Sequence, residues 1–284
     1  MRGTALDSLM RATRDMAAPD IDDRVGRIAA DRPVGIDPYG YDPQVARYAL
    51  ACASWVYRYY FRAEVRGTDR VPAGRVMLVS NHSGQLPLDA LVIAASMILE
   101  AEPPRLVRAM VEKWALTLPY VGELFTRCGQ VLGVPENCRD LLERDEAILV
   151  FPEGVKGISK TWDQRYRLAE FGLGFMRLAL ETKTPIVPVA VVGAEEQYVN
   201  LHNSSTLARL FGTPVFPLIP QALVPALGWL PAPTKYHVHL GEPMHFQGDP
   251  DDEDQEIERK VWVVRTTIQS MLNRGLKDRK SIFF

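Results

Sequence analysis

The sequence contains little cysteine and no excess of one charge, and both deficits narrow the class of protein. Its 284 residues include three cysteines, which form neither a C-x-x-C pair nor a regular framework. A zinc ribbon and a disulfide scaffold are therefore poorly supported, and we expect reduced thiols in a cytosol. The formal net charge of -2 lacks the basic excess that is typical of proteins that follow nucleic-acid phosphates. We therefore expect no nucleic-acid partner.

Long apolar runs and a secretion signal are also missing. No apolar run forms before Asp7, so we expect no signal peptide. The apolar run at residues 90–99 is shorter than the roughly 18 to 20 residues that a spanning helix needs. The uncharged stretch 210–234 is longer, but it contains six prolines, which would interrupt a helix repeatedly. These features argue against secretion and against an ordinary transmembrane helix.

The rest of the composition is that of a folded globular chain. Hydrophobic residues make up 47% and charged residues 24%, which are ordinary globular proportions. We favour one large domain over two small ones. Three parts are expected: a polar N-terminal lead with one short helix over residues 1–42, an amphipathic helix over 43–63, and the main domain over 64–284.

Short apolar segments alternate with helical patterns within the main domain. Valine-rich segments typical of buried strands cover residues 75–80, 105–111, 147–151 and 185–192. Helical patterns are predicted at 86–99 and 166–181. An edge-like strand is expected at 236–240, before a helix at 251–277 that begins acidic and ends basic. This alternation predicts the α/β class, with a central mixed, mostly parallel sheet flanked by helices.

The expected helix over residues 43–62 has no acidic residue and carries a basic stripe. Arg47, Ser54, Arg58 and Arg62 fall on one helical face, with Trp55 and several tyrosines among the other positions. Two interpretations remain open: the helix packs on the sheet, or it anchors the protein at a membrane with its arginines toward anionic lipid.

The uncharged stretch 210–234 leaves similar alternatives open. It can pack into the core, wall an acyl-chain cavity or enter the membrane. The sequence alone does not choose among these, because composition does not say what covers an apolar surface.

Residues 80–89, with the sequence SNHSGQLPLD, have the clearest potential for chemistry. They follow a predicted buried strand, where a turn can present a side chain at the carboxyl edge of a sheet. The imidazole of His82 can there accept the proton of a hydroxyl, with a carboxylate fixing its tautomer. A single histidine and acid arise often by chance, as His245 and Asp249 illustrate, so further motifs are needed.

Three further blocks follow in order: G-E-L-F-T-R, F-P-E-G and I-V-P-V-A. Together with the histidine segment they resemble the motifs of the glycerolipid acyltransferase family, which includes lysophosphatidic-acid acyltransferases. The likeness spans about residues 66–243. It is closest to the branch related to monoacylglycerol and diacylglycerol acyltransferases, because of N-H-S-G-x-L-P-x-D, F-P-E-G-V-K-G-I-S-K and V-V-G-A-E-E.

The resemblance implies that residues 64–284 form an acyltransferase domain, and it implies roles for individual residues. It makes His82 the general base and Asp89 the carboxylate that orients it. The remaining implied positions bind the acceptor or add positive charge near it, and they are Arg127, Glu153, Gly154, Lys156 and Lys160.

Two departures from the family pattern, and a structural alternative for each motif, qualify these roles. Six residues separate His82 from Asp89 where the common motif has four, and Arg127 lies two residues after Phe125. Asp89 also suits the first turn of a helix. Arg127 can equally form a surface ion pair, and F-P-E-G can be a turn that ends a strand.

The resemblance implies a bacterial-type O-acyltransferase of lipid metabolism and phospholipid biosynthesis. The donor would be acyl-CoA or acyl carrier protein, and the acceptor a lysophospholipid such as 1-acylglycerol-3-phosphate. A neutral monoacylglycerol or diacylglycerol is the alternative acceptor, and a non-catalytic lipid-binding membrane protein is a third possibility. A serine esterase is disfavoured because the chain has no G-x-S-x-G elbow.

Neither a cofactor nor a metal is expected, because an activated hydroxyl can attack a thioester directly. His237, His239 and His245 lack the cysteine and acid partners of a zinc site, so we expect them to be structural. The expected location is cytoplasmic and peripheral, at the membrane surface on the inner face of the cell membrane.

Overall fold

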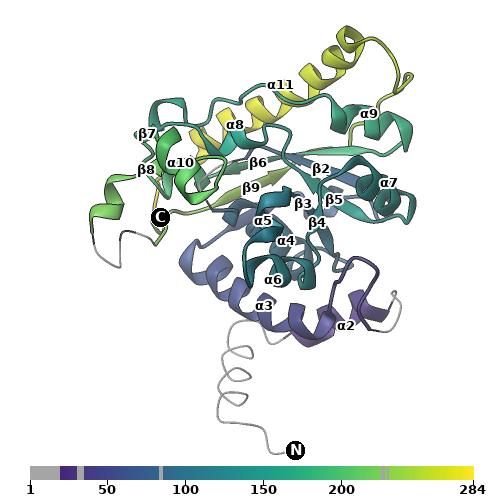
Figure 1. Cartoon of the computed structure of the whole chain (residues 1–284). Helices are drawn as coiled ribbons and strands as arrows, with labels where there is room; N and C mark the ends of the chain where they lie inside the picture. Colours follow the sequence, from purple (N-terminus) through teal and green to yellow (C-terminus); the bar gives the residue numbers. More distant parts are fainter. Residues whose placement is uncertain (1–19, 31–34, 83–85, 225–227, 229) are drawn as a thin grey trace, which may run out of the picture.

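A seven-stranded sheet with the order β1-β9-β6-β2-β5-β3-β4 forms the centre of the protein (Figure 1). The computed structural model describes residues 20–30, 35–82, 86–224, 228 and 230–284. The strands are β1 (Glu64–Arg66), β2 (Val76–Ser80), β3 (Val107–Val111), β4 (Val131–Leu132), β5 (Ala147–Val150), β6 (Ile186–Val192) and β9 (His237–Leu240). All neighbouring strands run parallel except β6 and β9. The predicted mixed, mostly parallel α/β sheet is therefore confirmed.

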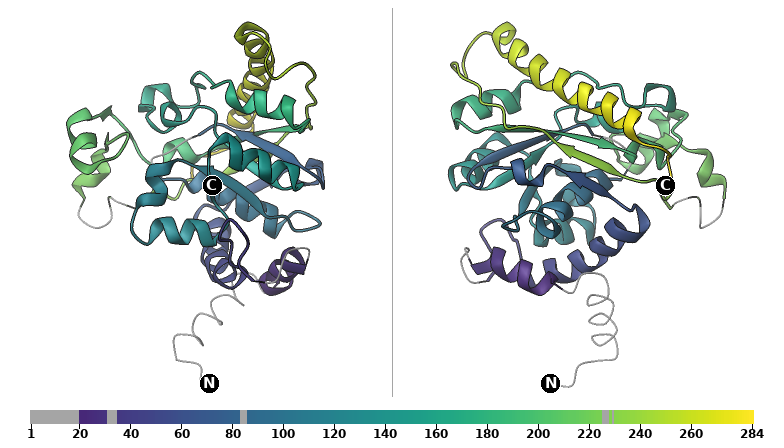
Figure 2. Two further views of the ribbon diagram at one scale, coloured as in Figure 1. Left: turned by 45° about the vertical axis from the view of Figure 1, so that its right-hand side comes forward. Right: turned by 180° about the vertical axis from the view of Figure 1, so that it is seen from behind.

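Helices cover both faces of this sheet (Figures 1 and 2). One face is covered by α2 (Ile21–Ala30), α3 (Pro43–Trp55) and α4 (Leu88–Leu99), and the other by α7 (Pro135–Glu143), α9 (Gly174–Glu181) and α11 (Asp254–Asp278). The segments after β3, β5 and β6 contain the shorter α5 (Lys113–Thr117), α6 (Val121–Arg127), α8 (Val155–Ile158) and α10 (Ser205–Phe211). A second sheet pairs β7 (His202–Asn203) with β8 (Pro217–Leu218).

Strand β2 shows how the sequence pattern builds the two layers. Val76 and Leu78 belong to the core under α2, α3 and α4, whereas Met77 and Val79 belong to the core under α9 and α11. Successive side chains of a strand point to opposite faces, so a strand covered on both faces is apolar at every position. The buried strand ends at the turn that carries His82.

The helix predicted over residues 166–181 forms only in its second half, as α9. The preceding residues run as a loop whose backbone amides are bound by distant side chains. Tyr166 N donates to Oε2 of Glu195 at 2.6 Å, and Ala169 N donates to Oε2 of Glu153 at 2.7 Å. Two buried carboxylates thus fix the backbone of this loop, and the apolar periodicity predicted a helix that is too long here.

The predicted helix 43–62 is an α-helix as far as Trp55, followed by one π-helical turn, η1 (Val56–Tyr60). Ser54 is fully buried, which corrects the expected polar stripe. Arg62 has a positive φ of 46° and lies beyond the helix. One face, including Leu50 and Tyr57, packs in the core, and the other is exposed.

The described part of the expected polar lead is joined to the sheet domain. Ile21 and Val25 of α2 are buried in the core shared with α3 and α4. Asp37 makes a buried ion pair with Arg108 of β3, and Nε of Arg108 lies 3.4 Å from Oε2 of Glu146. Residues 1–19 of the expected lead lie outside the described residues.

Strand β9, expected at an edge, lies inside the sheet. It pairs with β1 in parallel and with β6 in antiparallel orientation. Burial alternates along this strand: His237 and His239 are half-buried, and Val238 and Leu240 are fully covered.

Candidate functional site

The end of β2 is fixed to β6 by one buried amide side chain. Asn81 Nδ2 donates to the carbonyl of Val191 at 3.1 Å, and Val191 N donates to Oδ1 of Asn81 at 2.8 Å. These bonds continue the sheet pairing past the last residue of β2, so His82 leaves the sheet from a defined position.

His82 is held by a carboxylate and by an aromatic ring. Its Nδ1 lies 2.8 Å from Oδ2 of Asp89, which is completely buried in the first turn of α4. Oδ1 of Asp89 accepts from Ala90 N at 2.8 Å. The ring of Phe151 stacks on the imidazole with centroids 4.2 Å apart. When Nδ1 donates to the carboxylate, Nε2 carries the lone pair that can accept a proton from a hydroxyl.

Glu153 of F-P-E-G supports the backbone of the same turn. Its Oε1 accepts from His82 N at 3.0 Å, and its Oε2 accepts from Ala169 N at 2.7 Å. Lys160 Nζ lies 2.9 Å from the same Oε2. Both carboxylate oxygens of Glu153 are therefore engaged within the protein.

Lys160 lies between two buried carboxylates. Its Nζ is 2.9 Å from Glu153 and 3.2 Å from Oε1 of Glu195, and the three side chains are at most 8% exposed. Burial alone would lower the pKa of Lys160, but the two carboxylates outweigh burial and raise it. Burial raises the pKa of Glu195 to about 7, although the nearby ammonium opposes the shift. Two carboxylates with one ammonium thus form a charge cluster behind His82.

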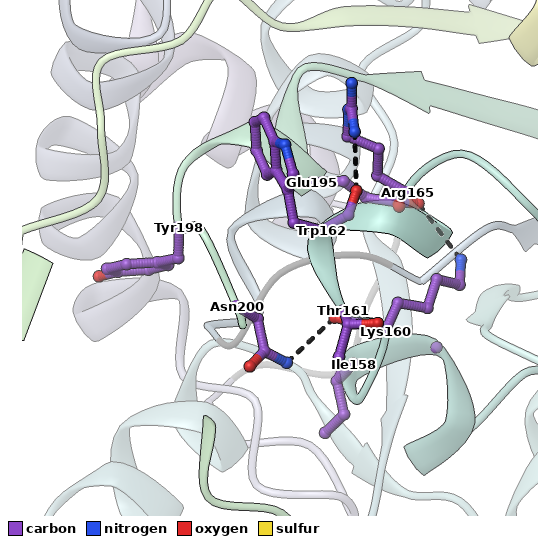
Figure 3. A pocket seen from close by; sticks show the side chains of 9 residues that line it. Ile158, Lys160, Thr161, Trp162, Arg165, Glu195, Tyr198 and Asn200 are labelled. Carbon is purple, nitrogen blue, oxygen red and sulfur yellow. Dashed lines mark hydrogen bonds and ion pairs between the residues drawn. The ribbon is translucent and has the colours of Figure 1, made fainter. Parts of the chain in front are cut away.

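A small pocket adjoins this cluster (Figure 3). It is lined by Gly157, Ile158, Lys160, Thr161, Trp162, Arg165, Glu195, Tyr198 and Asn200. The guanidinium of Arg165 lies over the Trp162 ring, 4.4 Å from its centroid, and Nη1 donates to the Trp162 carbonyl at 2.8 Å. Asn200 Nδ2 donates to the carbonyl of Lys160 at 3.0 Å.

Gly157 brings the wall of this pocket into contact with His82. A Cβ at this position would lie 2.8 Å from Cβ of His82 and 3.0 Å from Cβ of Glu153. Real carbon atoms do not approach so closely, so the packing of α8 against the histidine turn requires glycine.

Of the other residues implied by the resemblance, Arg127 and Lys156 lie outside this cluster, and Gly154 follows Glu153 directly. Arg127, at the end of α6, pairs with Glu123 at 2.8 Å and with Asp42 at 3.6 Å. Lys156 is exposed and pairs with Glu170 at 3.1 Å. Gly154 has a positive φ of 52° at the start of α8, which is consistent with a turn that ends β5. The structure thus places His82, Asp89 and Glu153 together and leaves Arg127 and Lys156 in surface ion pairs.

Sequence reasoning missed the contributions of Asn81, Phe151, Gly157 and Glu195, and it gave Lys160 a different role. All of them lie in or beside the quoted motifs N-H-S-G, F-P-E-G-V-K-G-I-S-K and V-V-G-A-E-E. The motifs therefore contained these residues, but the sequence did not indicate which of them contact one another in the folded protein.

Among the described residues there is no group of three or more histidine, cysteine or acidic side chains arranged to hold a metal ion. No helix within the described ranges is both long and apolar enough to cross a bilayer.

Comparison with known proteins places the chain among acyltransferases. Residues 62–192 match the family described as Acyltransferase. An uncharacterized protein of Mycobacterium tuberculosis is 36% identical over 257 residues, covering 88% of this chain and 72% of the relative. A chicken (Gallus gallus) protein described as a DGAT1/2-independent enzyme synthesizing storage lipids is 22% identical, covering 75% of this chain and 60% of its own.

A solved structure extends the comparison to the fold. The crystal structure of the 1-acyl-sn-glycerophosphate acyltransferase PlsC from Thermotoga maritima matches with a TM-score of 0.54 and 16% identity. The match covers 96% of this chain and 97% of the other. The likeness to this structure runs the length of the chain and concerns the fold. The sequence matches confirm the expected enzyme class: this chain belongs to the acyltransferase family.

Proposed function

We propose that this protein transfers a fatty acyl group from acyl-CoA or acyl carrier protein to a hydroxyl of a glycerolipid, with His82 as general base. The observation that carries the proposal is the 2.8 Å contact between Nδ1 of His82 and the buried Oδ2 of Asp89. This contact orients the imidazole so that Nε2 can receive a proton, which is the arrangement that activates weak hydroxyl nucleophiles.

The proposed reaction needs only this base and the two substrates. Nε2 of His82 takes the hydroxyl proton while the hydroxyl oxygen attacks the thioester carbonyl. The tetrahedral intermediate then collapses, the carbon–sulfur bond breaks, and the thiolate takes the proton from the imidazolium. Asp89 stabilises that imidazolium by its charge. We propose that no metal or further cofactor takes part.

Lys160 and Glu153 are proposed as positioning residues. Glu153 holds the His82 amide, and Lys160 compensates the charge of Glu153 and Glu195. Neither side chain needs to contact substrate for this role. Gly157 serves the same purpose by allowing α8 to pack on the histidine turn.

The first acceptor candidate is a lysophospholipid such as 1-acylglycerol-3-phosphate. Its phosphate requires a cation, and Arg165 lines the pocket beside Lys160 with its Nη1 bound to a backbone carbonyl. A neutral monoacylglycerol or diacylglycerol is the second candidate. This second candidate is supported by the ion pairs of Arg127 and Lys156. Both residues are implied phosphate contacts, but both are already paired with carboxylates of the protein.

The remaining elements of the proposal concern location and organisation. We propose that the protein acts peripherally on the inner face of the cell membrane. In this proposal residues 43–63 face the membrane, and 64–284 form the acyltransferase domain after a lead over 1–42. The exposure of Trp55 and Tyr59 on the outer face of α3 and η1 supports membrane contact there.

The test is acyl transfer by the purified protein, with both donor types and a panel of lysophospholipid and neutral acceptors, followed by mass spectrometry. The His82→Ala variant should lose about 10² to 10⁴ in turnover and keep its fold. His245→Ala, a change of the same kind at an exposed position, should remain active. Equal activity of His82→Ala and His245→Ala would refute the general base.

A further inference from the structure

Residues 197–224 and 230–234 present a large apolar surface to solvent. This segment contains β7, α10, β8 and η5 (Pro220–Leu223), and it projects from one side of the sheet at the left of Figure 1. Its exposed large apolar side chains are Leu201, Leu210, Phe211, Leu218, Leu223, Val224 and Leu230. Leu210 is 73% exposed and Leu223 is 86% exposed. Apolar patches of this kind on a monomer mark interaction sites.

The charge of the same segment indicates what it contacts. Residues 197–234 contain no acidic residue and one arginine, Arg209, in a chain that has 35 acidic residues. The neighbouring residues 43–62 also lack acids, and their Arg47 is turned toward α2, where its Nε lies 3.7 Å from Oδ1 of Asp22. An acid-free apolar segment with an exposed arginine, Arg209, is complementary to an anionic bilayer, where apolar groups enter the acyl layer and the arginine meets headgroups.

Direct contacts join the two acid-free segments into one surface. The hydroxyl of Tyr60 donates to the carbonyl of Pro231 at 2.6 Å, and Nη2 of Arg62 donates to the carbonyl of Pro233 at 2.5 Å. The ring of Trp55, which is exposed, lies 6.2 Å from that of Tyr60. Tyr60 of η1 and the adjacent Trp55 of α3 therefore border the apolar segment.

The apolar segment begins at the wall of the pocket beside His82. Tyr198 and Asn200 line that pocket (Figure 3), and Trp162 N donates to the carbonyl of Asn200 at 2.8 Å. Asn203 Nδ2 donates to the carbonyl of Ser159 at 2.6 Å. A lipid held by this segment is thus next to the candidate site.

We propose that residues 197–224 and 230–234 form a membrane-docking surface that seats the candidate site on an anionic bilayer. A lipid acceptor then reaches His82 without leaving the bilayer. The delivery of a lipid acceptor to His82 rests on the proposed function, whereas the binding of this surface to a bilayer does not depend on it. Because the contact is mainly apolar, this part of binding should resist salt, unlike an arginine contact.

The test compares two changes of exposed apolar side chains. The double variant Leu210→Ser/Leu223→Ser alters the proposed surface, and Trp262→Ser alters a residue that is 62% exposed on α11, outside that surface. Flotation with vesicles of phosphatidylcholine and phosphatidylglycerol measures binding. The double variant should bind at least about tenfold more weakly, because burial of one large apolar side chain corresponds to roughly that factor. Trp262→Ser should bind as the unchanged protein does.

Acyl transfer gives the second readout. The double variant should lose turnover on an acceptor embedded in vesicles and keep it on a short-chain acceptor dissolved as monomers. Unchanged flotation of the double variant, or an equal loss in Trp262→Ser, would overturn the docking surface. If the unchanged protein transfers no acyl group but shows the expected difference in flotation, the proposed function fails and the docking surface stands.

Discussion

Replacing Lys160 by methionine removes the cation of a buried charge cluster while keeping most of the side-chain volume. Lys160 is 8% exposed, and its Nζ lies 2.9 Å from Glu153 and 3.2 Å from Glu195, both of which are also buried. Breaking a buried ion pair by removing one partner costs about 3 to 5 kcal/mol, because the remaining charge stays desolvated. Here two carboxylates remain, so we expect a loss of unfolding free energy at the upper end of that range.

The loss should depend on pH in a defined direction. Burial raises the pKa of folded Glu195 to about 7, above its ordinary value of 4.5, so the folded protein binds this proton more tightly than the unfolded chain does. The contribution of this proton to the free energy of unfolding is fully present below about pH 4.5, declines as the pH rises, and is lost above about pH 7. In Lys160→Met the ammonium no longer opposes this shift. The variant should therefore lose less unfolding free energy at pH 6, where Glu195 is protonated, than at pH 8.

Urea unfolding at pH 6 and pH 8 measures both effects. The matched control is Lys156→Met, because Lys156 is 67% exposed and its pair with Glu170 is on the surface. Surface pairs contribute about 0 to 1 kcal/mol, so this variant should be nearly as stable as the unchanged protein. The reasoning is refuted if the two lysine variants lose equal stability, or if the loss in Lys160→Met is the same at both pH values.

Three further predictions concern the turn at His82 and the acceptor. Asp89→Asn should lower turnover by about 10² to 10⁴ with little change in melting temperature, measured by steady-state kinetics and calorimetry; early melting with normal turnover would assign Asp89 to the helix terminus alone. Gly157→Ala places a Cβ 2.8 Å from that of His82 and should lower the free energy of unfolding by about 1 to 3 kcal/mol, measured with urea. It should also lower turnover; unchanged stability and turnover would contradict the close packing. Arg165→Gln should lower turnover on a phosphorylated acceptor more than Arg127→Gln does. Both variants are assayed against phosphorylated and neutral acceptors, and a larger loss in Arg127→Gln would show that Arg127 binds the phosphate.

The long central strands could be predicted from local sequence, whereas the two- and three-residue strands β1, β4, β7 and β8 were not predicted. Segments 75–80, 147–151 and 185–192 became β2, β5 and β6 with boundaries shifted by one residue at most. A strand covered on both faces is continuously apolar, and this signal is contained entirely in neighbouring residues. The motif order also identified the family before any geometry was available.

Residues 166–173 show where a local signal is insufficient. Their apolar periodicity is that of a helix, and Tyr166, Leu168 and Phe171 are indeed buried. The backbone is nevertheless a loop, and its Tyr166 and Ala169 amides donate to Glu195 and Glu153 from elsewhere in the chain. Periodicity reports which side chains are buried, but the partner of each amide is decided in three dimensions.

The sequence by itself determined the fold class, the family and the histidine at the end of a buried strand. Only the tertiary structure decided that Asp89 reaches His82 across six intervening residues, that Lys160 bridges two carboxylates, and that residues 201–224 turn apolar side chains outward. The physical reason is the range of the interactions. Strand and helix patterns depend on neighbours along the chain, whereas ion pairs, buried hydrogen bonds and exposure depend on segments that meet only after folding, as Asn81 meets Val191.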